Sequence, residues 1–149
     1  LMIIPILDRV NSLNQTALWT FNLGILLRHK IPVAEALTLV SQESPDVQIR
    51  SKLTDATNKI IAGSSPAEVF KEMDRIPSIA ARILAAGDRS GNLPEACQRV
   101  HQILSTRYKS QVQKVITFAE PIAVIVAGAF VLLIALSVML PIAELGGLL

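Results

Sequence analysis

The residues that could carry out chemistry in this chain are few and widely spaced. Its two histidines, His29 and His101, are more than seventy positions apart, and neither has a cysteine or carboxylate at metal-ligand spacing. We interpret both as surface or boundary residues. The single cysteine, Cys97, has no second thiol with which to pair, so we interpret it as a small buried apolar residue. The sequence therefore predicts no metal site, no disulfide and no cofactor.

Motifs for nucleotide binding and for nucleophilic catalysis are missing from the sequence. No glycine-rich loop ends in Gly-Lys-Ser or Gly-Lys-Thr, so the chain cannot hold nucleotide phosphates in the usual way. No Gly-x-Ser-x-Gly elbow is present either. We therefore expect a protein that is not an enzyme and that depends on a partner for any energy it uses.

A short polar run, GDRSGN, is the most conspicuous break in the apolar pattern of the first part of the chain. It resembles a calcium loop only superficially, because the bidentate glutamate of such loops is missing. In one interpretation Asp88 or Ser90 caps the following helix, while Gly87 and Gly91 adopt positive φ angles and form the turn. In the other interpretation Asp88 contacts a partner.

Glu120 is a carboxylate at the edge of a long apolar segment, where a charge is costly unless it reaches water or a partner. It could lie at the level of lipid headgroups, with Pro121 in the first turn of the apolar helix. Alternatively, it could point into a helix bundle and pair with a basic group of another subunit. The sequence leaves both interpretations open.

The apolar segment itself predicts a transmembrane helix. Residues 122–140 contain no charge, and about 19 helical residues cover the hydrocarbon core of a bilayer. All 14 Lys and Arg residues lie at or before Lys114, and after Pro121 the only charged residue is Glu144. The positive-inside rule then predicts a cytoplasmic domain over residues 11–116, a membrane helix over 117–143 and a periplasmic tail over 144–149.

The overall charge does not predict nucleic-acid binding. The net charge of +2 would permit weak attraction to membrane lipid, but basic and acidic residues alternate along the first part of the chain. Aromatic residues make up only 4% of the sequence, so there are few platforms on which bases could stack.

Before the apolar segment, hydrophobic residues recur at spacings of three and four, which is the pattern of amphipathic helices. No sustained alternation of period two indicates a strand. We predict an all-α fold, a compact antiparallel bundle of six helices followed by one C-terminal transmembrane helix, with Pro121 interrupting the last run. The predicted helices cover residues 11–30, 32–43, 46–61, 65–73, 77–86 and 93–116.

The opening residues 1–7 are apolar and contain Pro5, but this run is too short for a complete span. We predict a membrane-proximal connector over residues 1–10, the exit of an upstream transmembrane segment in a longer multi-pass protein. A loose apolar arm packed on the domain is the alternative.

Three motifs in this order resemble a known family. The first is LGILLRHKIPVAEAL over residues 23–37, and the second is AAGDRSGNL over residues 85–93. The third is the bracket formed by Glu120-Pro121 and Leu140-Pro141-Ile142 around the apolar segment. Together they resemble the type II secretion system F domain, found in inner-membrane platform proteins of type II secretion systems and type IV pili. Asp88 departs from the family pattern, which usually has Glu there.

The resemblance implies a parent protein with two tandem repeats of this domain and three membrane spans, of which this chain would be the second repeat and the last span. It also implies a platform role in the bacterial inner membrane. The implied partners are a cytoplasmic hexameric assembly ATPase, pilin or pseudopilin subunits, other inner-membrane assembly proteins and further copies in a homo-oligomer. The motif residues Gly87, Asp88, Gly91, Glu120, Pro121 and Pro141 are the candidate partner contacts.

A different class of protein also fits the residues without the resemblance. A tail-anchored helical adaptor would carry a similar soluble domain on one membrane helix and bind a cytosolic partner. The length of the parent protein separates the two hypotheses, because an adaptor needs no upstream repeat.

Overall fold

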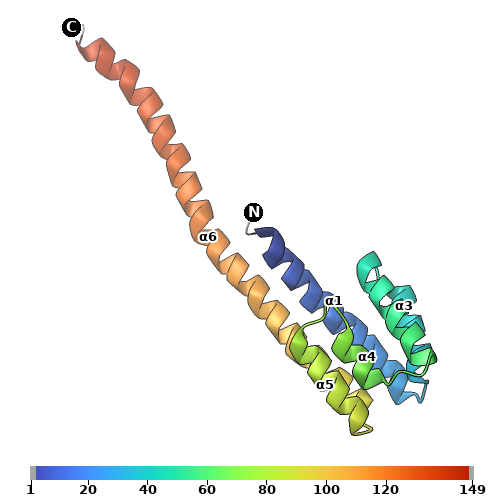
Figure 1. Cartoon of the computed structure of the whole chain (residues 1–149). Coiled ribbons are helices and arrows are strands. Elements are labelled where there is room, and N and C mark those ends of the chain that lie inside the picture. Colours follow the sequence, from blue (N-terminus) through green and yellow to red (C-terminus); the bar gives the residue numbers. More distant parts are fainter. Residues whose placement is uncertain (1–2, 148–149) are drawn as a thin grey trace. The chain divides into compact units, whose positions relative to one another are not determined.

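A computed structural model describes residues 3–147 of the chain, and these residues form helices joined by short turns (Figure 1). No strand occurs within this range, as the sequence pattern predicts. The first compact unit ends at Ser110 and the second begins at Gln111. The helices are α1 (Ile3–Arg28), α2 (Val33–Glu43), α3 (Val47–Ile61), α4 (Pro66–Glu72), α5 (Ser78–Arg89) and α6 (Leu93–Gly147).

Two helices of the first unit begin at the caps that the sequence predicts. The carboxylate of Asp46 accepts hydrogen bonds from the backbone N–H groups of Gln48 and Ile49, which α3 leaves without internal acceptors. The hydroxyl of Ser65 accepts a hydrogen bond from the backbone N–H of Glu68 at the start of α4. Pro32, predicted to lie in the first turn of α2, is instead the residue immediately before that helix.

α1 begins earlier than predicted. Residues 3–10, predicted to be a membrane-proximal connector separate from the first helix, are helical and continuous with the rest of α1. Pro5 is compatible with this start because it lies in the first turn, where its missing N–H would have no acceptor inside the helix. The first two residues of the predicted connector lie outside the described residues.

α6 is longer than predicted, because Pro121 does not end it. The helix continues through Pro121 and Pro141 to Gly147. A proline inside a helix removes one backbone hydrogen bond and normally kinks the helix rather than unwinding it. The residues on both sides of Pro121 are strongly apolar or good helix formers, so the helix resumes after it.

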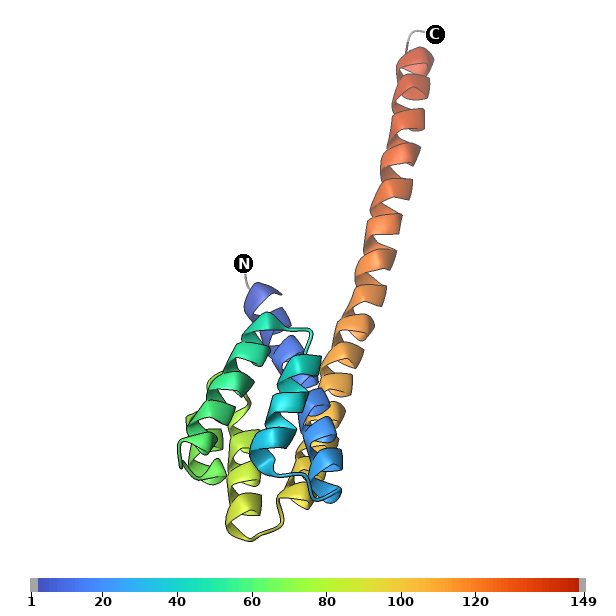
Figure 2. The same cartoon turned by 90° about the vertical axis from the view of Figure 1, so that its right-hand side faces the viewer.

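The core of the first unit draws on every helix. α2 packs against α1 and α3, where Figure 2 shows it as the cyan helix between them, and α4 packs against α5 and α3. Burial of each large apolar side chain stabilises the unit by about 1.5–3 kcal/mol. The fully buried side chains include one from each helix in turn, namely Leu23, Leu37, Leu53, Phe70, Leu84 and Leu104.

Candidate functional site

Gly87 lies inside α5 rather than in the turn that follows it. The residue is buried and helical and does not have a positive φ, so the prediction that it breaks the helix with a positive φ is wrong. A Cβ atom at this position would lie 2.2 Å from Cβ of Ala96 in α6, so only glycine permits the two helices to approach so closely here. Gly91 does adopt a positive φ of 73°, which confirms its predicted role in the turn.

Asp88 caps a helix, but not the predicted one. Its Oδ2 atom accepts a hydrogen bond of 2.9 Å from the backbone N–H of Ala67 in the first turn of α4. The start of α4 therefore has two side-chain acceptors, the hydroxyl of Ser65 and the carboxylate of Asp88. The prediction that Asp88 or Ser90 caps α6 is therefore wrong.

The start of α6 is organised by Asn92 instead. The backbone carbonyl of Asn92 accepts a hydrogen bond from the N–H of Ala96, and its side-chain amide donates to Oε2 of Glu95 at 2.7 Å. Ser90 turns back and donates its hydroxyl to the carbonyl of Gly87 at 3.2 Å. The polar turn is thus fixed by local hydrogen bonds, and its geometry does not require a bound ion.

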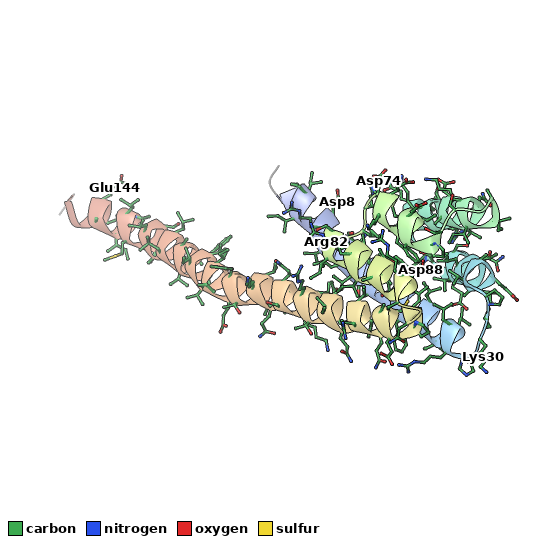
Figure 3. All side chains as sticks on the ribbon, turned by 60° about the horizontal axis from the view of Figure 1, so that its bottom comes forward. Asp8, Lys30, Asp74, Arg82, Asp88 and Glu144 are labelled. Atoms are coloured by element: carbon green, nitrogen blue, oxygen red, sulfur yellow. The ribbon has the colours of Figure 1, made fainter. Side chains whose placement is uncertain are left out.

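An open groove of about 410 Å³ runs between α5 and α6 beside this turn. Sequence reasoning missed it, because its two arginines come from different helices and form no motif along the chain. Arg82 lies on α5 (Figure 3), and Arg99 lies on α6. The lining consists of Arg82, Ile83, Ala86, Gly87, Ser90, Asn92, Glu95, Ala96 and Arg99.

Cys97 is fully buried between helices, as predicted for a small apolar residue. Burial raises the pKa of its thiol to about 12, because the thiolate would lose its hydration there. Cβ of Cys97 would lie 3.0 Å from a Cβ added at Gly24 of α1, so α1 and α6 also meet closely. A thiol in this setting is unreactive at neutral pH.

The two histidines lie on different parts of the first unit. Nδ1 of His101 is 2.8 Å from the carbonyl oxygen of Ala17. The centroids of the His101 and Phe21 rings are 4.7 Å apart. Because a carbonyl can only accept, Nδ1 of His101 carries the proton in this contact. His29 is exposed, lies in the turn after α1 and contacts the carbonyl of Ile25 in the last turn of that helix. Across residues 3–147, no three His, Cys, Asp or Glu residues gather as a metal site would require.

Glu120, Pro121 and Pro141 all lie in the second unit, on the exposed surface of α6. This part of α6 contains a window with a mean hydropathy of 2.9, none of it buried inside the protein. Of the helices described, α6 alone is long and apolar enough to cross a membrane. The candidate residues therefore divide into two groups, with Gly87, Asp88 and Gly91 in the first unit and the other three in the second.

Over the part of the chain that the structure describes, these features define a class of helical proteins with one helix long and apolar enough to cross a membrane. Comparison with known families refines this class. The family model described as type II secretion system (T2SS), protein F, matches residues 19–141, which is most of the chain. The chain belongs to this family.

Individual relatives support the same assignment. The type II secretion system protein F of Pseudomonas aeruginosa is 28% identical over 99% of the chain, and that of Aeromonas hydrophila is 25% identical over 97%. The type IV pilus assembly protein TapC of Aeromonas hydrophila is 22% identical over 99% of the chain. The chain spans only 36–37% of the length of these relatives.

Proposed function

We propose that this chain is part of a non-enzymatic platform protein that supports type II protein secretion or type IV pilus assembly in the bacterial inner membrane. The observation that carries the proposal is the family match over residues 19–141. Relatives named for type II secretion and for pilus assembly match nearly the whole chain, so both systems fall within the proposal.

The division of the chain into two units fits this role. In the proposal, residues 117–143 of α6 cross the membrane, and the domain over residues 11–116 stays in the cytoplasm. The distribution of charge supports this orientation, since all Lys and Arg residues precede the apolar segment. A cytoplasmic unit can contact a hexameric assembly ATPase, while a membrane helix can contact pilin or pseudopilin subunits.

The first test measures whether the protein is needed for assembly. We expect deletion of its gene to abolish secretion of the exported proteins or the formation of pili, and the complete gene to restore it. Normal secretion and normal pili in the deletion strain would overturn the proposed function. Co-purification of the assembly ATPase with the wild-type protein tests the finer proposal about partners.

The second test measures orientation by cysteine labelling in intact cells. Single cysteines at Gln111 and at Gly146 are compared after treatment with an impermeant maleimide. Cys97 is buried and its thiol has a raised pKa, so it should contribute little background, and a Cys97→Ala version serves as the control. We expect labelling at Gly146→Cys alone, and labelling at Gln111→Cys alone would reverse the orientation.

A further inference from the structure

The groove between α5 and α6 contains charge that the first unit does not neutralise. The ion pairs among residues 3–147 are Lys52 with Asp74 and Lys59 with Glu72, and neither lies in the groove. Within the same range, Arg82 and Arg99 form no ion pair and no side-chain hydrogen bond. Glu95, the one carboxylate of the lining, already accepts a hydrogen bond from Asn92.

Charge is also unevenly distributed along the first unit. Residues 33–77, which include α2, α3 and α4, contain seven acidic and five basic residues. Residues 78–110, which include α5 and the start of α6, contain five basic and two acidic residues. The groove therefore lies in the basic part of the unit, and its field attracts a negatively charged partner.

The other lining residues indicate what kind of anion fits. Ile83 and Ala86 add apolar surface to the lining that contains the two arginines, which suits the methylene groups of side chains. Glu95 in the same lining repels a dense polyanion such as a cluster of phosphates. A segment with separate carboxylates and apolar side chains satisfies all of these features, because it can pair with the arginines and leave Glu95 in water.

We propose that the α5–α6 groove is a docking site for a carboxylate-bearing segment of a partner protein. Acidic side chains of this segment pair with Arg82 and Arg99, and its apolar side chains pack on Ile83 and Ala86. The inference rests on the proposed function, since it assumes that the partner belongs to the same assembly machine.

Site-specific photo-crosslinking in the complete protein, in its own cells, tests the site. The amino acid p-benzoylphenylalanine replaces Ala86, an exposed residue of the groove, and in a control it replaces Asn58, an exposed residue of α3. Mass spectrometry identifies the crosslinked peptide. We expect a protein segment that contains Asp or Glu to be captured from Ala86 and not from Asn58.

Charge reversal then tests the chemistry. Arg82→Glu with Arg99→Glu should lower the crosslink yield at least about tenfold, because like charges would face each other across the contact. The control, Lys59→Glu with Lys71→Glu on α3 and α4, changes the net charge by the same amount and also removes the ion pair of Lys59 with Glu72, and it should leave the yield unchanged. Replacing the captured acidic residues by Arg should restore crosslinking in the groove double variant.

Several outcomes would overturn the groove proposal. The first two are capture of phospholipid only and capture of a segment without carboxylates. The third is no capture from Ala86 in cells where a positive-control crosslink between other proteins still forms. The fourth is an undiminished crosslink yield in the groove double variant. Thermal unfolding of each variant shows whether it is folded, and the single variant Arg99→Gln replaces any that is not. Failure of the proposed function would appear separately, as normal secretion and pili in the deletion strain.

Discussion

The two ends of α6 have almost opposite surroundings although they belong to one helix. In the first unit, α6 buries Leu93, Ala96, Cys97, Val100 and Leu104 at spacings of three and four, as an amphipathic helix does. Beyond Gln111 the large apolar side chains are exposed, including Phe130 at 64% and Ile134 at 63%. The first part is stabilised by the helices around it, whereas the second part lacks such neighbours within the described chain.

Within residues 3–147, the second unit is therefore not stabilised by packing against other helices. Soluble monomers rarely expose contiguous apolar surface on this scale. A helix that is apolar on all sides is stable in a hydrocarbon solvent, where its backbone hydrogen bonds are satisfied internally. The comparison therefore predicts that equal substitutions in the two units have unequal effects on folding.

The largest expected difference is between two phenylalanines. Phe70→Ala should lower the free energy of unfolding by about 3–5 kcal/mol, since Phe70 is fully buried in the first unit. Phe130→Ala should change it by less than about 0.5 kcal/mol, because Phe130 touches no core. Urea unfolding of the detergent-solubilised protein, followed by the fluorescence of the single and buried Trp19, measures both. Equal destabilisation by the two variants would contradict the comparison.

A smaller difference is expected between two glycines of helices. Gly87→Ala should destabilise the first unit by about 1–3 kcal/mol, because the new methyl group collides with Ala96. Gly128→Ala, whose Cβ would meet nothing within 4 Å, should be neutral in the same unfolding experiment.

The collision at Gly87 can be relieved from the other side of the contact. Ala96→Gly alone should cost about 0.5–1 kcal/mol, as glycine does in a helix. Combined with Gly87→Ala it should recover most of the loss, so the two effects would be strongly non-additive. Simple additivity in this double-mutant cycle would show that the close approach of α5 and α6 is not what requires glycine.

The smallest effect is expected at Asp88. Asp88→Ala should cost about 1 kcal/mol through loss of the hydrogen bond to Ala67, while Asp88→Asn should keep most of the stability because its amide oxygen can accept the same bond. Ser65→Ala is the matched control, because it removes the other cap of α4. Thermal unfolding measures all three.

The same variants test whether Asp88 also contacts a partner. If it only caps α4, Asp88→Asn should support normal secretion or pilus assembly. Loss of assembly by Asp88→Asn, with parental stability and with normal assembly by Ser65→Ala, would instead indicate that the charge meets a partner.

Local signals predicted most of the helices. Asp46 and Ser65 mark helix starts because a cap acts within three residues of its own position, and such patterns are visible in a sequence. Proline residues indicated the ends of helices less reliably. Pro5 and Pro121 both lie inside helices, since proline removes a single hydrogen bond and the surrounding residues decide whether the helix continues.

The candidate site was predictable only in part, because its contacts join residues far apart in sequence. Asp88 reaches Ala67 across 21 positions, and no spacing rule indicates that pairing. The sequence places Gly87 in the turn because glycine is common there, whereas its role in the structure depends on Ala96 in the next helix. No pattern along the chain links Arg82 to Arg99, since only the packing of α5 on α6 places them in one groove.

The hydrogen bond between Asp88 and Ala67 also links the stability of α4 to that of α5. α4 has seven residues, fewer than an isolated helix needs to persist in water. Its first turn takes a side-chain acceptor from the penultimate residue of α5, which ends at Arg89. Local unfolding of α5 would therefore remove a cap from α4, and we expect the two helices to open together.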